Sequence, residues 1–386
     1  MVWLSTLVGG LGIGMVSPLL PVFAQEMGAS GVWLGLAFAG FAISETPLMP
    51  FMGRLSDRFG RKLFLAMGMF IYALAALGYV YSSTYQLLVL FRILSGMGAA
   101  MFFPVAFAYV GDLSPSGLEG RYMGLFNVAF LFGWGAGPLL GGMVKDSLGT
   151  DATFWAMVLM SAAAFLLLVL FLPGRQLAGS KNRPRERETS WLQLLRDNVV
   201  IAACSFELIW GLGFGAVFSF LPVFMTTGLG ATATAIGIVI STRALLNGVL
   251  VYPYGWLADR ANRILLVIVG AMVTAAGAMA LPWMSSFVSL IVLFAITALF
   301  ESVAVPAANA IAVDRGRELG MGSMMGLFNM SMAAGLLLGS VLGGLVQDFL
   351  GIGNVFRFSA MAMLGGIVVF YALMKRGQSS STNKLV

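Results

Sequence analysis

Long apolar runs alternate with short polar segments along the whole chain. The hydrocarbon core of a bilayer is about 30 Å thick, so a helix that spans it needs roughly 20 apolar residues. Runs of this length predict twelve helices, over residues 1–24, 31–53, 63–82, 85–111, 120–144, 152–172, 197–226, 232–256, 263–282, 286–312, 322–346 and 351–374. The first run has no Lys or Arg before it, unlike a secretory signal peptide, and we interpret it as a transmembrane helix shortened at its start. The pattern predicts an all-α integral membrane protein.

Composition agrees with this class, because 59% of the 386 residues are hydrophobic and 10% are charged, which excludes a water-soluble globule. The net charge of +6 does not indicate a nucleic-acid partner, since the basic residues are scattered in short loops. The predicted partner is the lipid bilayer. With one cysteine, Cys204, no internal disulfide can form, and without histidine any proton chemistry must use carboxylates.

The Lys and Arg residues collect in one set of loops, whereas the opposite loops contain Lys145. Positively charged loops remain in the cytoplasm. We therefore expect a multi-pass protein of the plasma membrane, the inner membrane of a bacterium, with both termini in the cytoplasm.

The two halves of the chain repeat. Residues 123–127 and 325–329 both read Met-Gly-Leu-Phe-Asn, an offset of 325 − 123 = 202, and the same offset relates Asp146 to Asp348. Because each copy has an even number of helices, the copies are parallel and related by an axis along the membrane normal. The repeat predicts an N-terminal six-helix bundle (1–173), a cytoplasmic linker (174–196), a C-terminal six-helix bundle (197–376) and a polar cytoplasmic tail (377–386).

The loop after the second helix reads Gly-Arg-Leu-Ser-Asp-Arg-Phe-Gly-Arg-Lys over residues 53–62. It resembles the loop signature of the major facilitator superfamily, and the twelve-helix pattern extends that resemblance over essentially the whole chain. The resemblance implies two pseudo-symmetric six-helix bundles, a transporter that alternates access to a central cavity, and a monomer.

In that family an acid and an arginine of this loop form a charge cluster with an acid at the cytoplasmic end of the fourth helix. The cluster closes the cytoplasmic side in the outward-facing state. The matching residues, with their counterparts 202 positions later, are Asp57, Arg58, Arg61, Asp112, Asp259, Arg263 and Asp314. Gly60 permits a positive φ, and Asn262 at the equivalent position is the residue that best tolerates the same conformation. The alternative is that these charges only fix topology.

The fifth helix has five small or helix-bending residues that resemble the antiporter signature of the drug:proton exporters. They are Gly133, Gly137, Pro138, Gly141 and Gly142. Glycines four apart allow helices to approach closely, and proline bends a helix. Ordinary helix packing explains the glycines as well. Ser340 replaces the proline in the second copy, so the predicted bend belongs to one half only.

Among the ionisable residues inside predicted helices, we single out Glu45, Arg92, Glu207, Arg243 and Glu301. Charged groups inside a membrane are costly, and they are functional candidates by default. Arg92, followed by Gly96 and Gly98, resembles the membrane-embedded arginine motif of the family. The family's central cavity is lined by helices 1, 4, 7 and 10, which favours Glu207 and Glu301 as substrate or proton groups. Glu207, Arg243 and Glu301 could form one cluster near the midplane, or they could be neutralising pairs that position helices.

These features together favour a proton-coupled exporter, an antiporter, of small hydrophobic or amphipathic compounds, with the proton as coupling ion and no other cofactor. The first helix lacks the acid that many drug:proton exporters have there, so coupling could reside in the second half. A lipid or sugar exporter and a non-transporting membrane receptor are the alternatives. An enzyme is not expected, because the sequence contains no metal-ligand cluster, nucleophile triad or phosphate loop.

Overall fold

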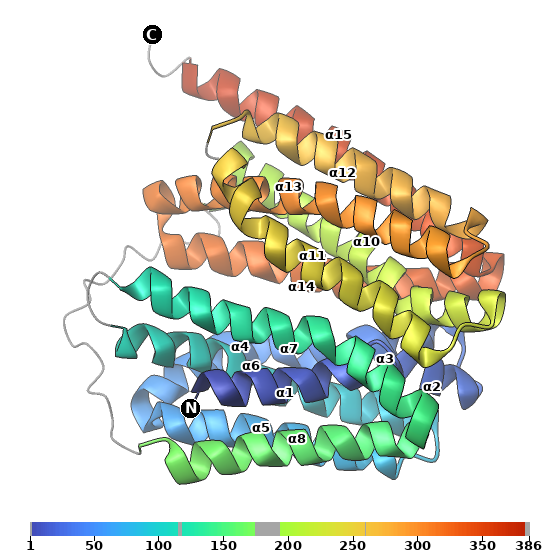
Figure 1. Cartoon of the computed structure of the whole chain (residues 1–386). Coiled ribbons are helices and arrows are strands. Elements are labelled where there is room, and N and C mark those ends of the chain that lie inside the picture. Colours follow the sequence, from blue (N-terminus) through green and yellow to red (C-terminus); the bar gives the residue numbers. More distant parts are fainter. Residues whose placement is uncertain (1, 115–117, 174–193, 259, 383–386) are drawn as a thin grey trace. The chain divides into compact units, whose positions relative to one another are not determined.

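The structure is a computed structural model that describes residues 2–114, 118–173, 194–258 and 260–382 (Figure 1). The regular elements in these ranges are all helices, and twelve segments are long and apolar enough to cross a membrane. The predicted all-α membrane class is therefore confirmed. Most of the predicted linker, residues 174–193, and the last residues of the predicted tail, 383–386, lie outside the described residues, as does Asp259.

Two helices make up each of the first two spans, and one helix makes up each later span of the first repeat. The bounds are α1 (Val2–Val16), α2 (Leu20–Glu26), α3 (Gly31–Ala39), α4 (Phe41–Phe59), α5 (Arg61–Val80), α6 (Tyr85–Leu113), α7 (Glu119–Leu148) and α8 (Thr150–Phe171). The second repeat contains α10 (Asn198–Leu229), α11 (Ala233–Ala258), α12 (Arg263–Ala280), the short 3-10 helix η1 (Leu281–Trp283), α13 (Phe287–Leu319), α14 (Met321–Leu350) and α15 (Ile352–Thr382).

The prediction that the first two spans are continuous helices was wrong. The first is interrupted at residues 17–19, next to Pro18 and Pro21, which cannot donate a backbone hydrogen bond. The second is interrupted at Gly40, which has no side chain to stabilise a helix interior. Both interruptions expose backbone groups inside the membrane segment, and those groups need other partners.

The loop after the second span turns sharply at a glycine in the first repeat, whereas the equivalent loop of the second repeat has no glycine at that position. Gly60 joins α4 to α5 with φ +98°, as predicted. The matching expectation for Asn262 was wrong, because its φ is −68°. Its side-chain oxygen instead accepts the backbone N–H groups of Ile264 and Leu265, so that it caps the first turn of α12.

Two compact units can be distinguished along the chain. The first consists of Met1–Lys181 and Phe218–Gly248, and the second consists of Asn182–Val217 and Val249–Val386. The ends of α10 and α11 that adjoin residue 230 therefore belong to the first unit. This division places residues 218–248 in the first unit. The sequence repeat, on which the predicted bundle boundaries are based, places them in the C-terminal bundle.

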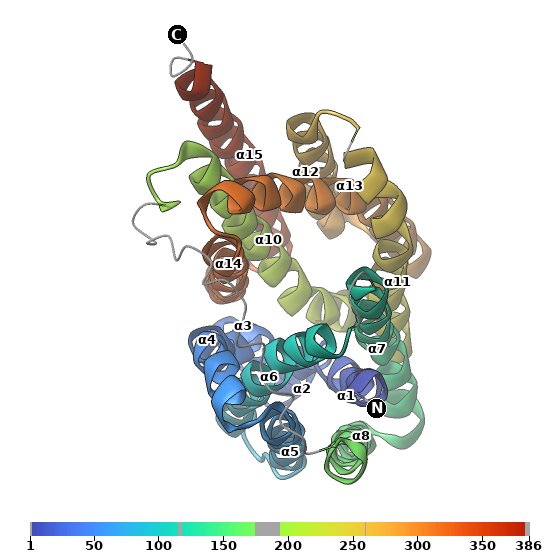
Figure 2. The ribbon, with the colours of Figure 1, turned by 90° about the vertical axis from the view of Figure 1, so that its left-hand side faces the viewer.

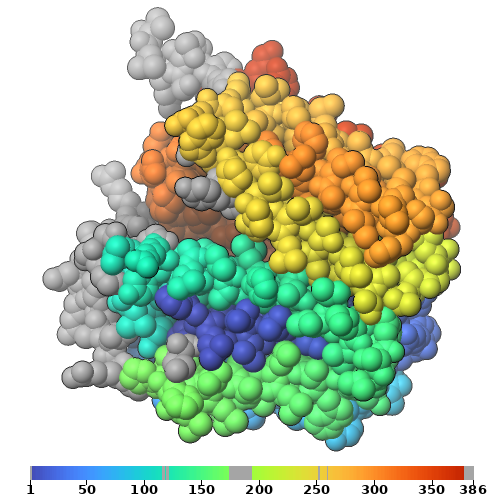
Figure 3. All heavy atoms as spheres, in the orientation of Figure 1, coloured from blue at the N-terminus to red at the C-terminus, as the bar shows by residue number. Residues whose placement is uncertain are grey.

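Within the first unit, α1 packs against α7 and α8, and α6 packs against α4 and α5. Figure 3 shows α1 at the surface with α7 on one side and α8 on the other. Within the second unit, α12 packs against α13 and α15, and α13 and α15 both contact α14. Figure 2 shows α12 beside α13. Most of the candidate functional residues lie on these packed helices, whereas Glu207 lies on α10 and Arg243 on α11.

Candidate functional site

A cavity of about 280 Å³ lies in the first unit, and six of its thirteen lining residues are aromatic. Its apolar lining includes Phe41, Phe103, Phe107, Phe130 and Trp134. Two pairs among these are four residues apart on α6 and α7, a spacing that puts both rings of a pair on one helix face. The rings of Phe103 and Phe130 meet edge to face with centroids 5.3 Å apart. Such walls suit a flat apolar or aromatic ligand.

Arg92 of α6 reaches this cavity, and its guanidinium is 3% exposed. Its Nε and Nη2 both donate to the backbone carbonyl of Phe38, at 3.0 and 2.9 Å, and Nη1 donates to the Ser17 hydroxyl at 3.1 Å. The guanidinium also lies over the Phe41 ring, 4.7 Å from its centroid. Ser17 lies in the interruption of the first span, and Phe38 and Phe41 flank the interruption of the second. One arginine therefore joins the two broken spans.

Close packing brings α4 and α6 together at the same point. A Cβ built on Gly96 would stand 2.0 Å from the Phe41 carbonyl oxygen, so only glycine fits there. The Ser44 hydroxyl donates to the Ile93 carbonyl across the same contact. The glycine that follows Arg92 in the sequence motif is thus the residue that lets the guanidinium reach Phe38.

Glu45 lines the cavity from α4, about one turn beyond the interruption at Gly40. The structure therefore brings together two of the five predicted intramembrane charges, Glu45 and Arg92. A carboxylate beside aromatic rings can attract a ligand that carries a positive charge, because both the charge and the ring faces favour a cation. The cavity thus combines apolar walls with groups of both signs.

The aromatic walls were missed by the sequence analysis. The pairs Phe103 with Phe107 and Phe130 with Trp134 offered a signal, since each pair is four residues apart on a predicted helix. With 30 Phe and 8 Trp in the chain, that spacing alone did not distinguish cavity walls from lipid-facing rings.

The other predicted intramembrane charges are also buried. Glu207 on α10 is 6% exposed and Glu301 on α13 is 7% exposed, and both lie in the second unit. Arg243 on α11 lies in the first unit, with its guanidinium 4.5 Å from the centroid of the Phe218 ring. The clustering of Arg243 with the two carboxylates stays a prediction.

The charge cluster predicted around the loop after the second span is assembled in the structure. Arg61, the first residue of α5, forms ion pairs with Asp57 at 3.1 Å and with Asp112 at 2.8 Å. The Asp57 side chain is 64% exposed, whereas Arg61 and Asp112 are 16% and 17% exposed, so the pair with Asp112 is the better shielded. Arg58 does not join the cluster, and its guanidinium lies 5.5 Å from the centroid of the neighbouring Phe59 ring.

The second repeat has the corresponding pair. Arg263, the first residue of α12, forms an ion pair with Asp314 of α13 and donates from Nε to the Ala258 carbonyl at 3.1 Å. Asp259, the third predicted member, lies outside the described residues. The structure therefore repeats the helix-to-helix arginine pair of the first cluster.

Substitution of Arg61 by alanine is expected to slow transport about tenfold and to change protein stability by no more than about 1 kcal/mol. A partly exposed ion pair contributes little to folding, but one that exists in only one transport state shifts the balance between states by its whole energy. Initial transport rates and thermal unfolding of the purified protein measure the two effects. Arg58→Ala is the matched control, and equal rates for the two variants would count against a gate.

The predicted antiporter motif has two packing faces on α7. A Cβ on Gly137 would stand 2.7 Å from the backbone of Gly14, and one on Gly141 would stand 2.2 Å from the Met15 carbonyl oxygen, so this face fits closely onto α1. A Cβ on Gly142 would stand 2.2 Å from the Ala233 carbonyl oxygen, so another face fits onto the start of α11. Gly133 extends the contact with α1, because a Cβ on Gly133 would stand 2.9 Å from the Leu7 carbonyl oxygen.

The sequence of the chain is similar to those of known membrane transporters. The family model described as Major Facilitator Superfamily matches residues 2–226 and 207–385. An uncharacterized MFS-type transporter of Methanocaldococcus jannaschii is 27% identical over 378 residues, 97% of each chain. The quinolone resistance protein NorA of Staphylococcus aureus is 28% identical over 190 residues, which is 49% of this chain and 46% of NorA.

Solved structures show the same fold. A bacterial homolog of the human lysosomal transporter Spinster, in an inward-facing and occupied conformation, has a TM-score of 0.81 at 13% identity, covering 97% of this chain and 95% of the other. The nucleoside transporter NupG has a TM-score of 0.78 at 13% identity, covering 97% and 100%.

Twelve segments that are long and apolar enough to cross a membrane define a multi-pass membrane protein. The chain belongs to the Major Facilitator Superfamily. The predicted superfamily and its fold are confirmed.

Proposed function

We propose that the protein is a proton-coupled exporter, an antiporter, of small hydrophobic or amphipathic compounds. The observation that carries the proposal is the aromatic cavity that contains Glu45 and Arg92. Its walls favour flat apolar compounds, and Glu45 favours those with a positive charge. The partial similarity to the quinolone resistance protein NorA supports the same substrate class.

The proposed cycle uses the buried carboxylates to exchange substrate for protons. A carboxylate in a membrane interior is costly to leave charged, so its protonation changes the affinity of a nearby site for a cationic or polar ligand. We assign this task to Glu207 and Glu301, which are buried on α10 and α13, with Glu45 as a further contributor. The arginine pairs at Asp112 and Asp314 would close the cytoplasmic side in one state of the cycle.

The proposal includes the setting of the protein. The distribution of Lys and Arg between loops favours a plasma membrane location, in a bacterium the inner membrane, with both termini in the cytoplasm. We propose that the monomer is the transporting unit, as the superfamily of the chain implies.

Transport by the purified protein in liposomes tests the proposal. A pH gradient would be imposed, lipophilic cations and neutral drugs would be added one at a time, and lumenal pH would be followed together with substrate movement. Antiport predicts that each transported compound causes proton flux in the opposite direction. Substrate movement without proton flux would contradict proton coupling, and movement of lipids or sugars in place of the drug panel would contradict the substrate class.

A further inference from the structure

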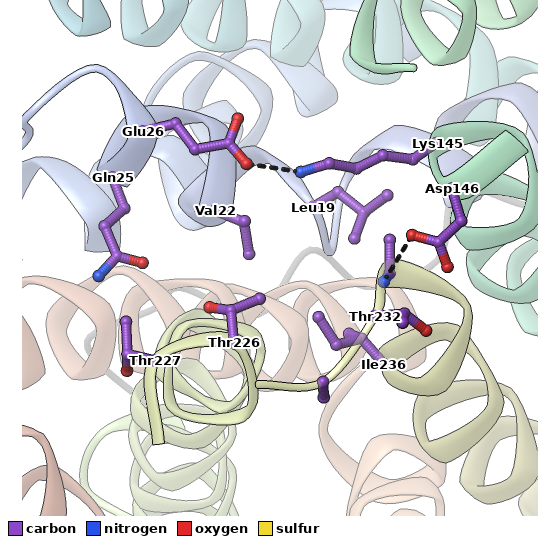
Figure 4. Close-up of a pocket in the computed structure, with 12 residues that line it drawn as sticks. Leu19, Val22, Gln25, Glu26, Lys145, Asp146, Thr226, Thr227, Thr232 and Ile236 are labelled. Carbon is purple, nitrogen blue, oxygen red and sulfur yellow. Dashed lines mark hydrogen bonds and ion pairs between the residues drawn. The ribbon is translucent and has the colours of Figure 1, made fainter. Parts of the chain in front are cut away.

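The last turn of α7 is bonded to the first turn of α11 through one carboxylate. Asp146 accepts the backbone N–H of Ala233 at 3.0 Å through Oδ1 and that of Thr234 at 2.7 Å through Oδ2. Figure 4 shows the carboxylate pointing at the start of α11. The first N–H groups of a helix have no acceptor within the helix, and a negative charge there is favoured by the helix dipole. Asp146 therefore supplies both an acceptor and a matching charge.

The same two helices are joined again further along. The Ser241 hydroxyl, 2% exposed, accepts the backbone N–H of Leu139 at 3.2 Å. On α11, Gly237 lies between the residues of these two polar contacts. There the two backbones nearly touch, because a Cβ on Gly237 would stand 2.3 Å from the Pro138 carbonyl oxygen. The junction is thus a close-packed seam with a polar contact at each end.

The helices that meet in this seam come from different sequence repeats, since α7 precedes the linker and α11 follows it. Transporters of this fold work by movement of one repeat against the other. Asp146 lies 27 residues after the start of α7 at Glu119, or about 40 Å along the helix, so it is at the membrane face opposite the Arg61 cluster. A contact between repeats at this face must break whenever that face opens.

A cavity of about 440 Å³ adjoins the carboxylate. It is lined by Glu26 and Lys145, whose side chains form an ion pair at 2.8 Å, and by Thr226 and Thr227 from the end of α10. Figure 4 shows these side chains around the open space. The cavity gives solvent a route to the contact, so the helix ends have room to separate without exposing the apolar core.

We propose that Asp146 is the latch that keeps this face of the transporter closed and that Ser241 is a second, weaker latch. Asp146 holds α11 by two charge-assisted hydrogen bonds, which are stronger than neutral ones. Opening of the face costs both bonds, and closing restores them. The latch depends on alternating access and on neither the substrate nor the coupling ion.

Distances between spin labels at Leu148 and Thr227 test the latch in a Cys204→Ala background. Both positions are exposed, and they lie near the facing ends of α7 and α10. The starting protein should give mainly one short distance. Asp146→Asn should raise the population of a longer distance about tenfold, equivalent to about 1.4 kcal/mol, because asparagine loses the charge and one of the two acceptor oxygens.

Asp151→Asn is the matched control, because it removes an equal charge from the first turn of α8 at the same face. Identical distance distributions for Asp146→Asn and Asp151→Asn would overturn the proposal. If Asp146→Asn does not yield folded protein, Ser241→Ala takes its place, with a smaller rise expected. No rise there would then overturn the proposal. The measurement uses neither substrate nor a pH gradient, so its failure is distinct from a failure of drug:proton antiport.

Discussion

Replacement of Arg92 by alanine is expected to abolish transport and to destabilise the protein by about 2–4 kcal/mol. The guanidinium satisfies the Phe38 carbonyl and the Ser17 hydroxyl, both at interrupted helices inside the membrane segment. Loss of the donor leaves each of these buried acceptors without its partner, at about 1–3 kcal/mol per group. Thermal unfolding of the purified protein and initial transport rates measure the two effects.

Arg92→Lys separates charge from shape. Lysine keeps the positive charge but lacks the planar fork that binds Phe38 through two nitrogens. We therefore expect the stability of Arg92→Lys to lie between those of Arg92→Ala and the original protein, and its transport rate to be well below that of the original protein. Arg58→Ala is the control, since Arg58 is exposed and lies over its neighbour Phe59. An Arg92→Ala protein that unfolds and transports like Arg58→Ala would show that Arg92 does not join the broken spans.

The twelve spans were predictable because lipid imposes a simple requirement on sequence. A helix that crosses a bilayer must be apolar over a fixed length, so hydropathy alone locates it. The pairing of Arg61 with Asp112 was also predicted, through the resemblance to a family and through the repeat that places Arg263 with Asp314. Hydropathy and the loop motif can be read from short stretches of sequence, and the second arginine pair follows from the repeat.

The interruptions at Ser17 and Gly40 were not predicted, since hydropathy does not change where a helix breaks. Proline and glycine were visible there, but both occur elsewhere in continuous helices of this chain, such as Pro104 in α6. Whether a break is tolerated depends on a distant partner for the freed backbone groups. At the interruption next to Gly40 that partner is Arg92, more than 50 residues later in the chain, which binds the Phe38 carbonyl.

The role of Asp146 illustrates the same limit. The sequence showed that Asp146 and Asp348 occupy equivalent positions in the two repeats, but not what either one binds. The partners of Asp146 are backbone N–H groups at the start of α11, 87 and 88 residues away, and backbone groups leave no trace in side-chain patterns. Asn262 was misjudged for a related reason, because asparagine serves equally in a left-handed turn and as a helix cap.

Glu301 is the carboxylate for which the largest effect on coupling is expected. It lies on α13, the tenth span, and is 7% exposed. Ala298 and Ser302 of the same helix are buried with it, so the carboxylate is shielded from solvent. In such an environment binding and release of a proton change the local charge by one full unit with little screening. That property is what a coupling site for protons requires.

Glu301→Gln keeps the size and hydrogen-bonding capacity of the side chain but cannot exchange a proton. We therefore expect substrate-driven proton flux in liposomes to fall to the background of empty liposomes, while thermal unfolding and exchange of substrate for substrate across the membrane remain. Glu318→Gln is the control on the same helix, because Glu318 is exposed at the C-terminal end of α13 and pairs with Arg315. If Glu301→Gln retains full proton flux and Glu207→Gln loses it, coupling resides on α10 alone. If both variants retain it, the buried carboxylates of the second unit hold helices together and the coupling proton binds elsewhere, with Glu45 next to be tested.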